Sequence, residues 1–123
     1  MKNDNYKKGR LGEQIAKDFL IKKGYRIIEQ NFQTRFGELD IIATRDNLLV
    51  FIEVKLKTGT DFGRPEEMIT QKKLLQIKNT AEMFLVQEKA LKAIFKQYRI
   101  DAICIILENN VVKELKHYEN ITG

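Results

Sequence analysis

The sequence predicts a mixed α/β domain, in which helices flank one mixed β-sheet and the elements follow the order α-β-β-β-α-β-β. Two long segments, 6–23 and 65–88, carry apolar residues at helical spacing. Shorter runs rich in β-branched residues lie between and after them, as expected for strands. No repeat, low-complexity tract or linker divides the 123 residues, so we expect a single domain over residues 1–123.

The first helix is expected over residues 6–23, because apolar side chains share one stripe of it. The stripe consists of Leu11, Ile15 and Phe19, with Ala16 and Leu20 beside it. Gly24 follows two lysines, which is typical of a helix C-terminus.

Three strands are expected next, at 25–32, 38–44 and 48–56. The first reads YRIIEQNF and is the least regular. The second and third surround a short polar break, Arg45-Asp46-Asn47, which indicates a β-hairpin.

A glycine-containing loop at 57–64 is expected to separate this hairpin from the second helix. Pro65 and the acids after it favour a helix start there, and the helix is expected to end near residue 88. Two final strands, at 99–107 and 111–118, would be joined by a turn at Asn109-Asn110.

Composition limits the class of protein. The chain is 43% hydrophobic and 32% charged, which is typical of an ordinary globular protein. No apolar run is long enough to cross a membrane and the N-terminus has no secretory signal, so we expect a cytoplasmic protein in which Cys104 is a buried, reduced thiol. The net charge of +5 suits a nucleic-acid partner and suits plain solubility equally well.

Charged residues interrupt the most apolar stretch, GELDIIATRDNLLVFIEVK, at positions where a buried strand is expected. If Asp46-Asn47 is a two-residue hairpin loop, Asp40 falls opposite Glu53 and Glu38 falls opposite Lys55. Two carboxylates directly opposed on a sheet repel one another. A shared proton, a nearby cation or a bound metal would have to compensate them.

A carboxylate pair, a divalent cation and a lysine are sufficient to hydrolyse a phosphodiester. Mg²⁺ typically takes one or two protein carboxylates together with water and phosphate oxygens. Lys55 lies two residues after Glu53, on the same face of the strand, where it could orient water or stabilise developing charge. The alternative is a solvated hairpin end in which Asp40 caps a turn.

Two residues outside the hairpin fit the same site. Glu13 lies at the edge of the first helix's apolar arc beside Gly12; alternatively it forms an exposed pair with Lys17. Lys73 lies inside the apolar arc of the second helix, where it would be either a cation aimed at the acids or a lysine whose stem is buried and whose ammonium reaches water.

The spacing Asp40, twelve residues, Glu53-Val54-Lys55 resembles the signature of the PD-(D/E)xK nuclease superfamily, with Leu39 in place of the superfamily's proline. More closely, the chain resembles the bacterial YraN family. That resemblance is carried by GRLGEQIAKDFL, GYRIIEQNF, GELDII, FIEVK, FGRP, the helix from Ile69 through Lys73 and Ala81 to Leu85, and RIDAI, which appear in the family's order over most of residues 9–107. Archaeal Holliday junction resolvases are similar in the helix glutamate and in the acid spacing.

The resemblance implies a restriction-endonuclease-like fold and an active site at Glu13, Asp40, Glu53 and Lys55. It further implies that Mg²⁺ or Mn²⁺ is bound by Asp40, Glu53, the Val54 carbonyl and, through water or a second metal, Glu13. Candidate nucleic-acid contacts are Lys7, Lys8, Arg10, Lys57 and Lys73. Lys57 stands where the family often has arginine.

The expected function is therefore metal-dependent cleavage of DNA, including branched or junction DNA. A second reading is a non-catalytic nucleic-acid-binding or assembly module that retains the fold. Symmetric cutting of two strands would require a homodimer, for which the 57–64 loop and the 111–118 strand are candidate interfaces.

Overall fold

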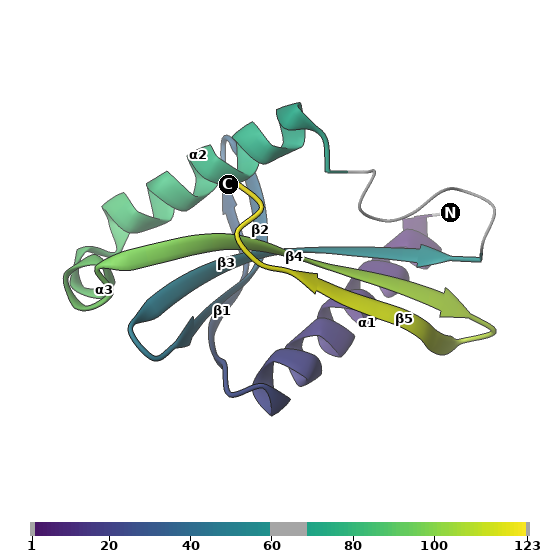
Figure 1. Cartoon of the computed structure of the whole chain (residues 1–123). Helices are drawn as coiled ribbons and strands as arrows, with labels where there is room; N and C mark the ends of the chain where they lie inside the picture. Colours follow the sequence, from purple (N-terminus) through teal and green to yellow (C-terminus); the bar gives the residue numbers. More distant parts are fainter. Residues whose placement is uncertain (1, 60–68, 123) are drawn as a thin grey trace.

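The computed structural model describes residues 2–59 and 69–122, with side chains from residue 8 onward. Helices flank a five-stranded sheet of order β1-β2-β3-β4-β5 (Figure 1). The elements are α1 (Lys2–Lys22), β1 (Arg26–Thr34), β2 (Gly37–Arg45), β3 (Leu48–Thr58), α2 (Gln71–Gln87), α3 (Lys89–Ile94), β4 (Gln97–Glu108) and β5 (Val111–Tyr118). The predicted mixed α/β class and all seven predicted elements are confirmed, and α3 is an addition.

The sheet is mixed because one connection crosses over it. β1, β2 and β3 form an antiparallel meander, and β4 and β5 form an antiparallel pair. β3 and β4 run parallel, and the chain between them includes α2. α1 and α2 lie on opposite sides of the sheet (Figure 1).

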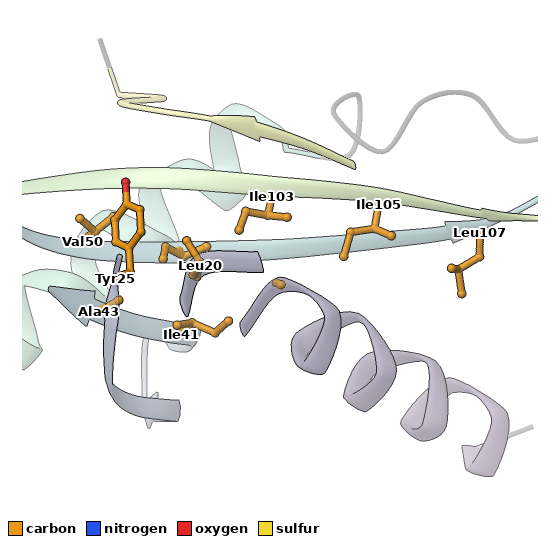
Figure 2. Close-up of a cluster of buried hydrophobic side chains, with 10 residues drawn as sticks. Leu20, Tyr25, Ile41, Ala43, Val50, Ile103, Ile105 and Leu107 are labelled. Carbon is orange, nitrogen blue, oxygen red and sulfur yellow. The ribbon is translucent and has the colours of Figure 1, made fainter. Parts of the chain in front are cut away.

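Alternation along the strands gives each face its own core. On the α1 face, Ala16 and Leu20 of the helix meet Ile41, Val50 and Ile103 of the sheet, all with no exposed surface (Figure 2). Burying each leucine, isoleucine or valine side chain of this core contributes about 1.5–3 kcal/mol. On the α2 face, aromatic rings predominate: Phe84 of α2 makes edge contacts with Phe32 and Phe51.

The second helix differs from its predicted start at Pro65. Residues 60–68 lie outside the described residues, and Ile69 and Thr70 are not helical. The Thr70 side chain accepts a hydrogen bond from the Lys73 N–H at 3.1 Å, so Thr70 is the N-cap and α2 begins at Gln71. The helix then breaks at Glu88, whose φ/ψ of −106°/66° separates α2 from α3.

The other predicted element boundaries differ little from the observed ones. β3 continues to Thr58, so the predicted 57–64 loop begins too early, and its remainder from residue 60 lies outside the described residues. Cys104 is buried, as expected. Among the described helices, none combines the length and apolarity needed to cross a membrane.

Candidate active site

The sheet opens into a fork between β2 and β3. The two strands pair from Arg45–Leu48 to Ile41–Ile52, in the predicted register. Beyond Ile52, β3 stays paired only with β4, while the start of β2 stays paired with β1 as far as Gly37–Thr34. We call the space between residues 37–40 and 53–58 the fork.

Each arm of the fork packs against a different helix. At the tip of the β1–β2 hairpin, a Cβ on Gly37 would lie 3.5 Å from Thr80 Oγ1 of α2. On the other arm, Gly12 of α1 approaches Leu56 so closely that an added Cβ would lie 3.1 Å from the Leu56 Cβ. The two arms therefore diverge towards opposite faces of the sheet.

Asp40 lies where the pairing of β2 with β3 ends. Its Oδ2 accepts a hydrogen bond from the Val54 N–H at 2.8 Å. At this position β2 therefore contacts β3 through the Asp40 side chain and not through its backbone. Burial raises the pKa of Asp40 and the charge of Glu38 raises it further, whereas the Val54 hydrogen bond, Lys73 and Lys55 act in the opposite direction. The strands have already separated beyond Ile41–Ile52, so neither predicted pair, Asp40 with Glu53 or Glu38 with Lys55, is formed between β2 and β3. Glu38 pairs with Gln33 of β1.

Glu53 is the most buried acid of the fork, with 3% of its surface exposed. Its Oε1 lies 3.7 Å from the Nζ atoms of both Lys55 and Lys73. Its Oε2 is buried and has no hydrogen-bond partner among the described residues. Burial, reinforced by the charge of Asp40, raises the pKa of Glu53 from 4.5 to about 7, although Lys73 and Lys55 act against the increase.

α1 brings Glu13 to the same place. Burial and the charge of Asp40 raise the pKa of Glu13, while a hydrogen bond from the Asn31 side chain and the charge of Arg10 lower it. No ion pair links Glu13 to Lys17 in the described part of the chain, so the structure favours the inward-facing alternative. One cavity of about 370 Å³ is lined by all four predicted catalytic residues, Glu13, Asp40, Glu53 and Lys55.

The predicted nucleic-acid contacts lie around this cavity to different extents. Lys8 and Lys57 line it, and the Lys8 Nζ donates to Thr58 Oγ1 at 3.4 Å. Lys73 faces Glu53 as described, and Arg10 acts electrostatically on Glu13. Lys7 lies in α1, but its side chain is outside the described set.

Asn31 also contacts the site, although the sequence did not predict it. It lies in β1 opposite Asp40, between the pairs Gln30–Ile41 and Phe32–Leu39, and its φ of 54° marks a local kink. Asparagine adopts this left-handed conformation more readily than most residues. That preference was the only feature of the sequence that could have indicated a kink at this position. Asn31 thereby connects the hairpin that carries Asp40 to Glu13 of α1.

A second buried cluster, around Asp101 on the α1 face, was also missed. Asp101 accepts hydrogen bonds from Arg99 Nε at 2.7 Å and Nη2 at 2.8 Å, from His117 Nε2 at 2.8 Å and from the Asn120 N–H at 2.9 Å. Arg99 also donates to the Tyr25 hydroxyl at 2.9 Å. Burial alone would raise the pKa of Asp101, but the bonds from His117, Arg99 and Asn120 outweigh it and hold that pKa below the usual value.

The donor set of the fork is small. Among the described residues, no group of three or more His, Cys, Asp or Glu side chains converges as a metal cluster would. Asp40 and Glu53 nevertheless offer carboxylate oxygens of the kind that Mg²⁺ and Mn²⁺ accept, and two carboxylates are within the number that Mg²⁺ usually takes. Glu53 Oε2, which has no hydrogen-bond partner within the described ranges, is the atom best placed to gain from a cation.

Comparison with known proteins gives a consistent family but no activity. The model of "Uncharacterised protein family UPF0102" matches residues 12–105. A UPF0102 protein of Caldicellulosiruptor bescii is 46% identical over 111 residues, covering 85% of this chain and 88% of its own. A UPF0102 protein of Syntrophomonas wolfei is 39% identical over 109 residues, covering 89% and 92%.

Proposed function

The chain belongs to the uncharacterised family UPF0102, the YraN family that its motifs resemble, and we propose that it is a metal-dependent endonuclease of the PD-(D/E)xK type acting on DNA. The observation that carries this proposal is Glu53. A buried carboxylate with an oxygen that no described residue satisfies, beside a second carboxylate and two lysines, is costly to maintain for stability alone.

The residues of the fork fit a divalent cation. Asp40, Glu53 and the Val54 backbone carbonyl would hold Mg²⁺ or Mn²⁺, and Glu13 would assist through water or a second ion. Bound there, the cation would polarise a phosphate oxygen and lower the pKa of water. It would also offset the burial that raises the pKa values of Asp40 and Glu53, together with the charges that add to it, Glu38 beside Asp40 and Asp40 beside Glu53.

The lysines of the fork have separate tasks in this proposal. Lys55, whose side chain is 24% exposed, would orient the attacking water and stabilise charge as it develops on the phosphate. Lys73 approaches Glu53 from α2 and would contact a neighbouring phosphate once a cation replaces it beside the carboxylate. Lys8 and Lys57, at the cavity lining, would hold the strand.

A non-catalytic nucleic-acid-binding module is the second candidate. Two lysine ammoniums within 3.7 Å of Glu53 already give it counter-charges, so the fork could persist without a metal. That module would bind DNA in EDTA as well as in Mg²⁺ and would cut nothing.

A cleavage screen separates the two candidates. The purified chain is incubated with Mg²⁺ or Mn²⁺ and labelled linear, flap and four-way DNA, with RNA of the same sequence as a further substrate. We expect metal-dependent cutting of at least one DNA, lost in Glu53→Gln and retained in Glu108→Gln, which removes an exposed carboxylate outside the fork. Cutting that survives Glu53→Gln, or no cutting of any substrate, would contradict the proposal.

The proposed activity also bears on assembly. One chain carries one fork, and symmetric cleavage of two strands requires two, so we propose a two-fold dimer on branched DNA. β5 is an edge strand with Val111 and Val112 exposed. Light scattering with and without four-way DNA should show the dimer, and a strict monomer that still cuts would favour a single-strand or flap nuclease.

A further inference from the structure

A second cavity, of about 440 Å³, lies at the other end of α2 from the fork. Its apolar lining comes from Leu85, Ala93 and Phe95, and Tyr98 adds an aromatic residue to the lining. Three lysines complete the lining: Lys89, Lys92 and Lys96. We call this cavity the α3 pocket, because α3 and the chain that follows it supply most of the lining.

The charge of the α3 pocket has one sign. None of its lining residues is acidic, and its three lysines are exposed and form no ion pair within the described ranges. Three like charges around one cavity repel one another unless an anion lies between them. The pocket is therefore complementary to a ligand with more than one negative charge.

The aromatic component selects among anions. Tyr98 is 46% exposed, and its hydroxyl donates to Glu82 at 2.9 Å while its ring contacts Phe51 edge-on. These two contacts fix the ring before any ligand arrives. A held, half-exposed aromatic ring beside lysines is the arrangement on which single-stranded nucleic acid stacks a base and places its phosphates.

We propose that the α3 pocket binds single-stranded nucleic acid, with a base on Tyr98 and phosphates on the three lysines. This binding is independent of the fork, whereas the path between the two sites rests on the proposed function. Lys73, in the first turn of α2, and Leu85, near its end, are twelve residues apart, or about 18 Å along the helix. A strand that follows α2 at roughly 3.4 Å per stacked nucleotide would span that length with about five nucleotides.

Fluorescence anisotropy with a labelled 12-nucleotide oligo-dT in EDTA tests the binding without cleavage. We expect Lys92→Gln/Lys96→Gln to weaken affinity and to lower the slope of log K against log salt by about 1.4, since each phosphate contact on single strands contributes roughly 0.7. The matched control is Lys17→Gln/Lys22→Gln, which removes the same charge from α1 and should leave that slope unchanged. Equal slopes in the two variants would overturn the proposal.

The stacking contact is tested separately. Tyr98→Leu should weaken binding roughly tenfold, while Tyr98→Phe, which keeps the ring and loses only the bond to Glu82, should bind nearly as well as the wild type. Equal affinity of Tyr98→Leu and Tyr98→Phe would overturn the stacking role. Melting curves of all variants establish that they are folded.

Two further outcomes separate this inference from the nuclease proposal and from a lipid surface. If the wild type cuts DNA but the lysine variants bind like their control, the fork is a nuclease and the α3 pocket is not its strand site. If no variant cuts but the lysine effect is present, binding stands and the nuclease proposal fails. If the lysine variant loses binding only to phosphatidylserine vesicles, the pocket serves a membrane and the inference is overturned.

Discussion

Asp101 and Glu53 are buried carboxylates at adjacent register positions of the two parallel strands, since Asp101 lies beside Ile52 and Glu53 beside Ala102. Asp101 faces α1 and both of its oxygens accept hydrogen bonds, from Arg99, His117 and Asn120. Glu53 faces α2, has two lysines at 3.7 Å and leaves one oxygen without a partner in the described part of the chain. Burial is similar, so the difference lies in how completely each acid is satisfied.

That difference distinguishes a structural acid from one suited to a ligand. The pKa of Asp101 is lowered, so the fold stabilises its charge, and the pKa of Glu53 is raised to about 7, so the fold opposes its charge. A full set of partners makes a buried carboxylate part of the core. A buried carboxylate with too few partners can still be stabilised by a bound cation.

The largest effect is expected from breaking the satisfied cluster. Asp101→Asn leaves the Arg99 guanidinium without its buried counter-charge, and removing one partner of a buried ion pair costs roughly 3–5 kcal/mol. Urea unfolding should show that loss, while Asp18→Asn on the exposed side of α1 should change stability by less than about 0.5 kcal/mol. A loss below about 1 kcal/mol at Asp101 would mean that the cluster is not structural.

The second prediction concerns pH and Glu53. Because its pKa is raised on folding, protonation favours the folded state: this stability is present below pH 4.5 and is lost as the pH rises through about 7. Between pH 5 and 8 the metal-free protein should lose stability on the order of 3 kcal/mol from this group. Glu53→Gln should flatten the dependence, and an unchanged pH profile in that variant would contradict the assignment.

A divalent cation is expected to stabilise the folded protein. Mn²⁺ at a hundredfold excess over its dissociation constant should stabilise the fold by about 2.7 kcal/mol. The gain should be larger at pH 8 than at pH 6, because the carboxylates must be ionised to bind. Asp40→Asn should abolish the rise in melting temperature. The absence of any rise at millimolar Mn²⁺ in the wild type would count against a metal site.

The smallest effect is expected at Asn31. Asn31→Gly keeps the positive φ available and loses the hydrogen bond to Glu13, whereas Asn31→Ala also imposes a left-handed conformation that costs about 1 kcal/mol. The alanine variant should therefore be less stable than the glycine variant by that amount in urea. Carboxyl NMR should show a higher pKa of Glu13 in both, and an unchanged value would remove Asn31 from the site.

The hairpin that carries both site acids was predictable because its signals are local. A two-residue loop fixes the register of its strands, and the alternation of apolar residues fixes which face is buried. Asp46, with a φ of 54°, closes that loop as the sequence suggested. The pairs from Arg45–Leu48 to Ile41–Ile52 followed from this geometry alone.

The fork and the Asp101 cluster depend on packing that no local pattern records. The fork opens because Gly37 packs on α2 and Gly12 on α1, two contacts between distant segments. The Asp101 cluster requires the irregularity between Ile106 and Leu107, which shifts the register by one residue and places His117 beside Ile103. Without that shift His117 would face the other side of the sheet. The N-cap at Thr70, by contrast, could have been predicted from the local sequence, but Pro65 favoured an earlier helix start.

The local origin of the hairpin has a consequence for the order of folding. Asp40 and Glu53 are separated by a single tight turn, and β-hairpins form within about 1–10 μs. Lys73, the counter-charge from α2, becomes available only when the crossover closes over the sheet. We therefore expect the carboxylates of Asp40 and Glu53 to come together before Lys73 can offset their repulsion. Mildly acidic solution protonates one of them, removes that repulsion and should accelerate the early collapse of this chain.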